Sequence, residues 1–179
     1  EGPYVNEVLG KKSLRKIITE VIKSTGVTRT AQFLDDIKNL GYDQAFRAGI
    51  SFNLGDVIIP AEKASLIEEG YKQVEEVKNN YAMGFITNNE RYNKVIDLWG
   101  AIDNKLTKIV EKQISADQQG FNPVYMMLDS GARGSTQQIK QLCGMRGLMA
   151  KPQKSGAAGA EIIENPIISN LKEGMTVLE

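Results

Sequence analysis

The 179-residue sequence contains no histidine. This absence excludes a Ser-His-Asp triad, a zinc site with histidine ligands and a histidine general base. The only cysteine, Cys143, can form neither an internal disulfide nor a multi-cysteine zinc site, and such usage is typical of an intracellular protein. No apolar run approaches the roughly 20 residues that span a bilayer, and no signal peptide opens the chain, so we expect no membrane association.

The sequence also lacks an excess of either charge, because basic and acidic residues number 22 each. This balance removes any global attraction to nucleic acid or to an anionic membrane, although it is compatible with a local basic cluster. The chain begins at Glu1 rather than at a methionine and stops within a pattern at Glu179, so we expect a piece of a longer protein. Its length fits one large or two small domains.

Residues 1–60 predict a helical region. Apolar residues at helical spacing form one stripe in 11–24, and a similar pattern follows in 28–40. Gly41 is the expected C-cap of the second helix. The stretch that follows is less regular and ends at Pro60, a residue suited to open the next helix.

Residues 61–114 predict an antiparallel helical hairpin with coiled-coil packing. The first arm, 61–83, is broken by Gly84, and the second arm spans 88–114. Apolar positions of the second arm step alternately by three and four residues, which is the seam of a coiled coil. These positions are Tyr92, Val95, Trp99, Ile102, Leu106 and Ile109. So narrow a seam favours one partner helix, and each arm would project by about 30 Å or more.

Residues 115–179 predict shorter elements. We expect a loop over 115–124, then a short apolar piece and a glycine-containing turn. Ser135 and Gln138 have the spacing of a capping box, which predicts a short helix running through Leu142. A turn of small residues is expected over 153–160.

The segment EIIENPIIS (161–169) predicts a short strand or hairpin with Pro166 at its edge. The expected fold class is therefore mainly α. It combines the antiparallel helical hairpin with a small helical bundle and a short β hairpin near the C-terminus. The three parts would be an N-terminal helical region (1–60), the hairpin (61–114) and a C-terminal region (115–179).

The sequence GARGS, residues 131–135, is a turn that leads into a predicted helix N-terminus. Exposed backbone N–H groups there favour an anion, and Arg133 could add a fork of donors. The spacing is not that of a phosphate-binding P-loop, and turns before helices often contain glycine and serine, so an ordinary turn is the competing interpretation. Cys143 is expected to be a small buried residue rather than a nucleophile, because no base partner is available.

Methionines flank the same turn on both sides. They would form either an adaptable contact surface or part of the core. The four are Met126, Met127, Met145 and Met149. Asp129 has no nearby carboxylate partner in the sequence, so a two-metal site has no support and we expect no metal site in this chain.

Four blocks of the sequence closely resemble the largest (beta-prime) subunit of bacterial DNA-directed RNA polymerase. They are RAGISFNLGDVIIPAEK (47–63), ERYNKVIDLW (90–99), YMMLDSGARGSTQQIKQLCGMRGLMAKP (125–152) and EIIENPIISNLKEGMTVLE (161–179). The blocks are long, specific and in the order of the family. Together with the connecting helices, they cover nearly the whole chain.

The resemblance implies that 61–114 are the rim helices of the secondary channel, through which nucleotides enter the polymerase. In the family, the tip of this coiled coil docks Gre-type and DksA-type factors that insert into the channel. Carried over to this chain, the tip runs from Gly84 to Asn93. The docking residues would be Thr87, Asn88, Asn89, Glu90, Arg91 and Asn93.

The resemblance also implies that residues 135–151 are the F-loop, which packs beside the bridge helix and the trigger loop that close over the incoming nucleotide. Arg133 matches the family arginine that reaches the nucleotide triphosphate. Residues 174–179 resemble the approach to the bridge helix and its first residues. The residues of this chain expected to support the F-loop are Lys140, Met145, Arg146 and Met149. Two departures are visible, because Lys140 stands where many members carry arginine and the segment 151–164 is longer than usual.

The resemblance further implies the binding partners and the location of this chain. Its partners would be the beta, alpha and omega subunits, with DNA, RNA and nucleoside triphosphates in the assembled enzyme, located in the cytoplasm at the nucleoid. The magnesium-binding motif NADFDGD and the trigger loop of the family are absent from this sequence. Magnesium of the parent nucleotidyltransferase would therefore be bound outside this chain, which we expect to hold no catalytic residue and no cofactor and to incorporate no nucleotide alone.

Two rival functions belong to other classes of protein. A free-standing coiled-coil adaptor that binds protein would explain the hairpin pattern but would leave the block around Arg133 unexplained. A small phosphate-binding enzyme built on the GARGS turn is opposed by the absence of histidine and of clustered carboxylates.

Overall fold

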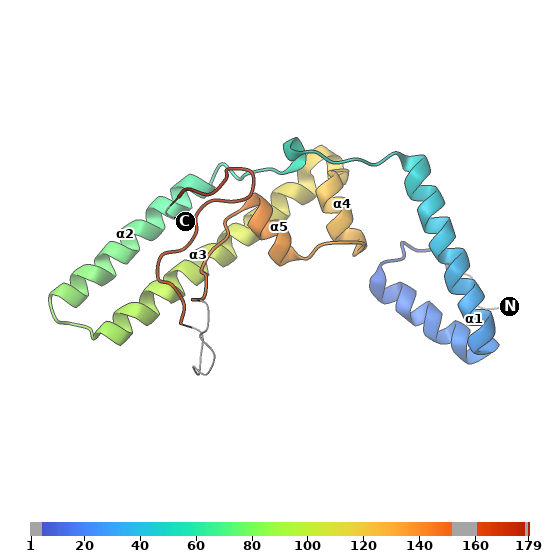
Figure 1. The fold of residues 1–179 in the computed structure, drawn as a ribbon, viewed down its shortest axis with the longest axis horizontal. Coiled ribbons are helices and arrows are strands. Elements are labelled where there is room, and N and C mark those ends of the chain that lie inside the picture. The colour runs from blue at the N-terminus through green and yellow to red at the C-terminus, as the bar shows by residue number, and fades with distance from the viewer. Residues whose placement is uncertain (1–4, 152–160, 178) are drawn as a thin grey trace.

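The computed structural model describes residues 5–151, 161–177 and 179 of the chain. The described part is built of helices and loops (Figure 1). The elements are α1 (Lys11–Ala48), the 3-10 helix η1 (Leu54–Asp56), α2 (Lys63–Ala82), α3 (Asn88–Ala116), the 3-10 helix η2 (Asp117–Gly120), α4 (Pro123–Ser130) and α5 (Thr136–Cys143). The predicted fold class is therefore confirmed as mainly α. The turn predicted over 153–160 lies outside the described residues.

Helix α1 is two helical arms joined at a sharp break, and it lies at the far end of the molecule from the hairpin (Figure 1). Gly26 makes the break with φ 78° and ψ 174°, values that a residue with a side chain rarely adopts. The two predicted N-terminal helices are thereby confirmed. The expected stop at Gly41 is wrong, because the second arm continues to Ala48, where Gly49 takes the left-handed conformation and its N–H donates to the carbonyl of Phe46.

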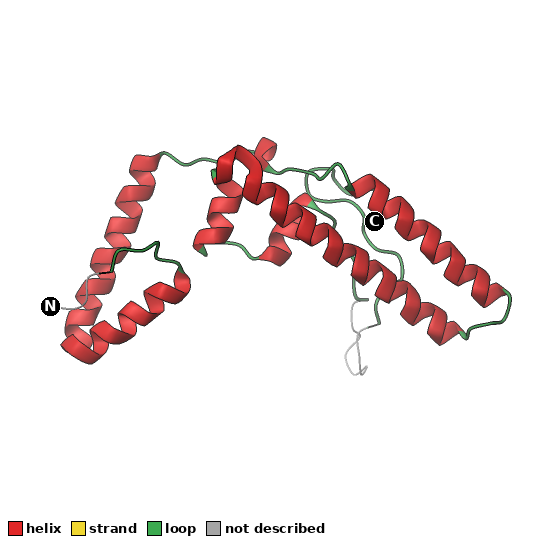
Figure 2. Ribbon diagram, turned by 180° about the vertical axis from the view of Figure 1, so that it is seen from behind, coloured by secondary structure: helices red, strands yellow, loops and turns green. Residues whose placement is uncertain are grey.

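Helices α2 and α3 form the predicted antiparallel hairpin, which projects as a long arm (Figure 2). Its interface buries Val74 of α2 against α3 residues that include Trp99. The ring of Tyr71 meets Trp99 edge to face, with centroids 5.1 Å apart. Gly70 allows the helices to approach closely, because a Cβ at this position would collide with Ile102 and lie 3.1 Å from the Trp99 ring.

The second half of α3 connects the hairpin to the helices that follow it. Beyond Leu106, its buried positions step by four residues to Val110 and Ile114. The predicted seam placed Ile109 at the interface, but that residue is only half-buried. The stripe rotates because this half of α3 packs against α4 and α5 instead of against α2. One helix therefore joins the projecting hairpin to the loops that follow it.

Helix α4 occupies residues for which the sequence predicted a loop and a short apolar piece. Asn122 caps it, since its side-chain oxygen accepts the N–H of Val124 at 2.9 Å, and Pro123 fills the first helical position. Asn122 is fully buried, and its amide nitrogen donates to the carbonyl of Asp56 and to the carboxylate of Asp117. The Asn-Pro pair was the sequence signal that would have predicted α4.

The predicted β hairpin near the C-terminus is wrong: the described residues contain two isolated antiparallel bridges and no strand. One bridge joins Gly147 to Ile167 and the other joins Ala150 to Ile162. Two residues separate the bridges on one side and four on the other, so the register shifts between them and no ladder can form. Pro166, which lacks an N–H, lies within the longer side.

The C-terminal segment instead lies along the helices, where side chains hold it (Figure 1). The buried Asn170 donates from its amide nitrogen to the carbonyls of Cys143 and Gly144, at 3.1 and 3.2 Å. The mostly buried Lys63 pairs with Glu173 at 2.5 Å. In the described part of the chain, no helix has the length and apolar character to cross a membrane.

Candidate functional site

The loop around Arg133 connects α4 to α5. Gly131 ends α4 in the left-handed conformation, with φ 70°, and its N–H donates to the carbonyl of Leu128. Ser135 begins α5 through the predicted capping box: its hydroxyl accepts the N–H of Gln138, whose side chain accepts the N–H of Ser135. Arg133 lies on the exposed turn between these two fixed ends, so its guanidinium is available to an external group.

A cavity of about 760 Å³ opens beside this loop. Most of its lining is apolar, and Arg133 and Gln138 are among the polar residues that line it. The lining residues are Phe52, Asn53, Leu54, Val57, Val124, Met127, Arg133, Gly134, Gln138, Ile139, Gln141, Leu142 and Leu171. Among the ion pairs found in the described residues, none engages Arg133. A cation at the edge of an apolar hollow can hold an anion that carries a flat organic body.

The residues predicted to support the F-loop fall into two groups. Lys140 and Met145 face inward: Lys140 pairs with Asp103 of α3 at 2.6 Å, and Met145 is fully buried. Arg146 and Met149 are exposed, and a guanidinium nitrogen of Arg146 lies 3.1 Å from the sulfur of Met175. The inward pair belongs to the packing between α3 and the loop, whereas the outward pair is available for contact.

The sequence left open whether the methionines fill the core or form a contact surface, and the structure places only one of the four in the core. Met145 is in the core, while Met126 and Met127 are half-buried and Met149 is exposed. Cys143 is fully buried, and this burial raises the pKa of its thiol. The prediction of a small buried cysteine is confirmed.

The tip of the hairpin is built on a capping box at the start of α3. The hydroxyl of Thr87 accepts the N–H of Glu90 at 3.3 Å, and the carboxylate of Glu90 accepts the N–H of Thr87 at 2.8 Å. The backbone N–H of Thr87 thereby lowers the pKa of Glu90. Among the predicted docking residues, Thr87 and Glu90 hold the helix end, whereas Asn89 and Asn93 are exposed without a role in the cap.

Arg91 is occupied by a contact that the sequence did not reveal. Its guanidinium makes two parallel hydrogen bonds to Glu164, at 2.7 and 2.8 Å, and lies 5.6 Å from the centre of the Tyr81 ring. Two of its nitrogens also donate to the side-chain oxygen of Asn88. Glu164 is 73 residues away in sequence, and no local pattern indicates such a pairing.

A second contact fixes the C-terminal segment to the same end of α3. The hydroxyl of Tyr92 donates to the carbonyl of Ile162 at 2.8 Å and accepts the N–H of Ile162 at 3.1 Å. Together with the pair formed by Arg91 and Glu164, it attaches the segment to the base of the hairpin tip.

We expect this attachment to weaken in acid. The hydrogen bonds from Arg91 lower the pKa of Glu164 below its ordinary value near 4.5. A group with a lowered folded-state pKa stabilises the fold above its unfolded pKa and loses that contribution as pH falls through the folded value. The attachment should therefore be intact at pH 6 and loosen below about pH 4.5.

The Ile162 amide signal in a ¹H–¹⁵N NMR titration would report this change. Glu164→Gln keeps the shape of the side chain and removes its titration, so its Ile162 signal should already be shifted at pH 6. An Ile162 signal that is the same in both proteins from pH 6 to pH 3 would contradict the prediction.

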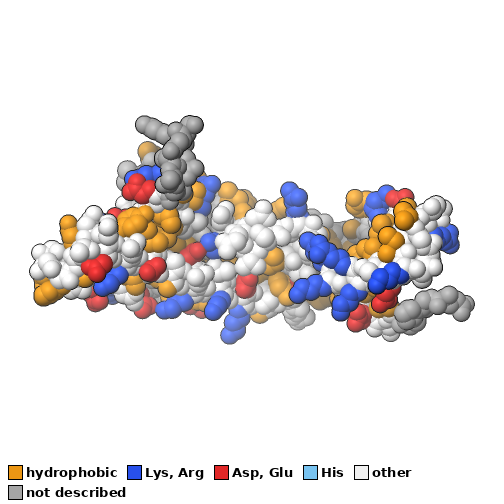
Figure 3. All heavy atoms as spheres, turned by 90° about the horizontal axis from the view of Figure 1, so that it is seen from below, with side chains coloured by type: hydrophobic (Ala, Val, Ile, Leu, Met, Phe, Trp, Pro, Cys, Tyr) orange, Lys and Arg blue, Asp and Glu red, His pale blue; other side chains and the backbone are white. Residues whose placement is uncertain are grey.

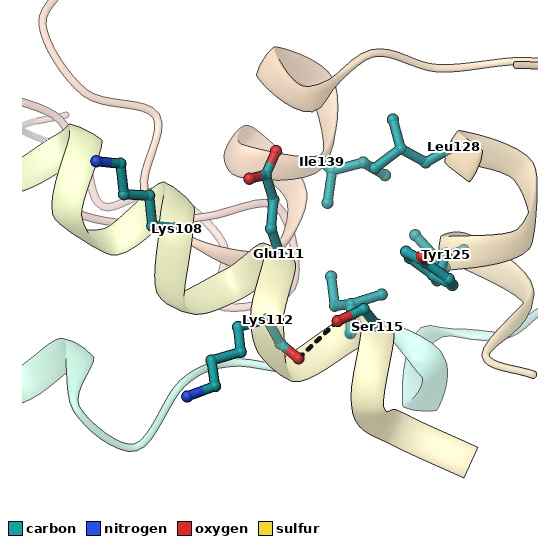
Figure 4. Close-up of a pocket in the computed structure, with 9 residues that line it drawn as sticks. Lys108, Glu111, Lys112, Ser115, Tyr125, Leu128 and Ile139 are labelled. Atoms are coloured by element: carbon teal, nitrogen blue, oxygen red, sulfur yellow. Dashed lines mark hydrogen bonds between the residues drawn. The ribbon is translucent and has the colours of Figure 1, made fainter. Parts of the chain in front are cut away.

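Another cavity, of about 380 Å³, lies among α3, α4 and α5 (Figure 4). Tyr125, Leu128 and Ile139 form its apolar side. Lys108 and Lys112 point away from that side, so no cations converge in the hollow. In residues 5–151, 161–177 and 179, no group of three or more potential ligands is placed to bind a metal ion.

The surface mixes charges of both signs, although lysine and arginine side chains gather on one face between the middle of the molecule and α1 (Figure 3). Large apolar side chains are also exposed. At the hairpin tip these are Met83 and Phe85, and the polar residues Asn89 and Asn93 at the start of α3 are exposed as well. An aromatic side chain with polar neighbours is a common composition for a protein-binding surface.

Comparisons with known proteins match two stretches of this chain to models of successive domains of RNA polymerase Rpb1. Residues 2–57 match the family model described as RNA polymerase Rpb1, domain 3, and residues 86–172 match RNA polymerase Rpb1, domain 4. The chain is 67% identical over all its 179 residues to the DNA-directed RNA polymerase subunit beta' of Bacteroides fragilis. It is 68% identical over 176 residues to that of Parabacteroides distasonis and 60% identical over 176 residues to that of Flavobacterium johnsoniae. It spans 12% of the length of each of these relatives.

Proposed function

This chain belongs to the family of bacterial RNA polymerase beta' subunits, and we propose that it acts as part of the enzyme that transcribes DNA into RNA from nucleoside triphosphates. Its partners would then be the beta, alpha and omega subunits, in the cytoplasm at the nucleoid. Large apolar side chains exposed near the end of α1 support burial in an assembly. They are Tyr42, Phe46, Ile50, Phe52 and Leu54.

The projecting hairpin carries the first part of the proposal, that α2 and α3 are rim helices of the secondary channel. An arm of 20 residues in α2 extends about 30 Å, which is enough to present its tip away from the body. The tip combines exposed Met83 and Phe85 with exposed Asn89 and Asn93. These residues would dock Gre-type and DksA-type factors.

A titration of the polymerase containing this chain with a Gre-type factor tests the docking role. We expect the pair of changes Asn89→Ala and Asn93→Ala to raise the Kd by about tenfold, because contacts at the centre of an interface carry most of its energy. These positions are preferable to Glu90 and Arg91, which hold the cap and the C-terminal segment.

Asn104→Ala is the matched control, since Asn104 is exposed on α3 away from the tip. Calorimetry should give this variant the Kd of the unchanged enzyme. An unchanged Kd for the double variant would reject Asn89 and Asn93 as docking residues.

The loop at Arg133 carries the second part of the proposal, that its guanidinium binds the triphosphate of the incoming nucleotide. The support is geometric: the cation stands on an exposed turn, between two capped helix ends and beside an apolar hollow. A guanidinium binds phosphate oxygens through two parallel hydrogen bonds, which suits this task. Magnesium and the catalytic carboxylates would come from the rest of the enzyme. The F-loop residues of this chain would support the bridge helix and the trigger loop.

A further inference from the structure

The pair formed by Asp103 and Lys140 joins the hairpin helix α3 to α5. The ammonium nitrogen of Lys140 lies 2.6 Å from one carboxylate oxygen of Asp103, and the side chains are only 11% and 18% exposed. Their positions are 37 residues apart in sequence. A buried ion pair contributes little net stability relative to apolar packing, but it favours one geometry, because each charge has lost its water and is strongly unfavourable unless it meets its partner.

The same carboxylate also lies against the backbone that follows α5. A Cβ added to Gly147 would lie 3.6 Å from each oxygen of Asp103, so the chain passes close to the carboxylate there. The second oxygen of Asp103 is buried and has no hydrogen-bond partner among the described residues. A lysine ammonium satisfies one oxygen, whereas an arginine fork could satisfy both.

Hydrogen bonds from residues 170–171 to backbone carbonyls hold the C-terminal end of α5, whereas the rest of the helix packs through apolar contacts. Ile139 and Cys143 bury one side of this eight-residue helix, and such contacts are not directional. Lys140 adds a directional contact at the middle of the helix. Because Arg133 lies only two residues before the N-cap Ser135, a rotation of α5 would displace the turn that carries Arg133.

We propose that Asp103 is a positioning residue which, through Lys140 and α5, sets the orientation of the loop that carries Arg133. This inference rests on the proposed role of Arg133 in binding the triphosphate. Asp103 touches no substrate in this arrangement. Asp103 would instead connect the Arg133 loop to α3, the helix whose N-terminal end forms the hairpin tip.

The test measures elongation kinetics of the assembled polymerase with full-length beta' subunits. Asp103→Asn keeps the side-chain shape and removes its charge, and we expect the apparent KM for nucleotides to rise about three- to tenfold with a smaller change in kcat. Adding Asp103→Asn to Arg133→Ala should raise KM no further, because the positioned group is already gone. A merely structural role would lower the elongation rate in proportion to the loss of folded enzyme. That loss would be the same whether Asp103→Asn is made with Arg133 present or together with Arg133→Ala.

Lys140→Arg gives a second, independent measurement, because its fork should keep the pair and leave KM within about twofold of the unchanged enzyme. Glu68→Gln is the matched control, since it makes the same chemical change in an exposed pair with Lys72 on α2. A normal KM for Asp103→Asn, or an equal rise in the presence and absence of Arg133, would overturn the inference. If Arg133→Ala itself leaves KM normal, the proposed triphosphate role fails and the positioning role falls with it.

Discussion

Polymerase that carries Arg133→Ala should assemble normally and elongate slowly at low nucleotide concentration. We expect its apparent KM for nucleoside triphosphates to rise by about tenfold or more, because hydrogen bonds to a charged group contribute roughly 1.5–3 kcal/mol and 1.4 kcal/mol corresponds to about a factor of ten. Assembly should be unaffected, since Arg133 lies on an exposed turn whose ends are held by Gly131 and Ser135. Elongation rates measured over a range of nucleotide concentrations would separate the change in KM from any change in kcat.

Two further variants sharpen this experiment. Arg133→Lys retains the charge but loses the planar fork, so its KM should lie between those of the unchanged enzyme and Arg133→Ala. Arg29→Ala removes another exposed arginine, on α1, where its partner is the side chain of Gln32, and should leave KM unchanged. Elongation kinetics of Arg133→Ala that match those of Arg29→Ala would reject the triphosphate assignment.

The hairpin could be predicted from sequence because its signals are local. The three-and-four spacing from Tyr92 to Leu106 specifies one apolar stripe, and Thr87 with Glu90 specifies where α3 begins. The same logic failed at Gly41, because glycine lowers helix propensity without forbidding a helix and the flanking residues continue the turn. A local sequence signal predicts an element well only when neighbouring residues and tertiary contacts do not favour another structure.

The C-terminal segment shows the opposite situation. Its β-branched residues predicted strands, but Glu164 and Ile162 of the segment bond to side chains of α3, and Asn170 bonds to backbone carbonyls at the end of α5. Side-chain packing and cross-chain hydrogen bonds override β propensity in such a context. The sequence also could not indicate that Arg91 and Lys140 are paired, because their partners are 73 and 37 residues away. The sequence placed these cations in the right elements but could not show that both are engaged.

The largest loss of stability should follow from Leu106→Ala. Leu106 is fully buried where α3 changes partners from α2 to α5, and a Cβ at Gly144 would lie 3.4 Å from it. Removing a buried leucine side chain leaves a cavity and costs about 3–4 kcal/mol in the free energy of unfolding. The loss should be this large because Leu106 lies in the middle of the core shared by the hairpin and the loop that follows α5.

Urea unfolding of the 179-residue chain would measure this loss through the fluorescence of Trp99, its single tryptophan, which is buried on the same face of α3 about two turns away. Leu40→Ala is the matched control, because Leu40 is 60% exposed on α1 and its truncation should change the free energy by less than about 0.5 kcal/mol. Similar unfolding midpoints for the two variants would mean that α5 does not pack on α3 in solution. In that case the Asp103–Lys140 pair would not form, and α3 could not determine the orientation of Arg133. The coupling between the hairpin and the Arg133 loop therefore requires that this core is stable.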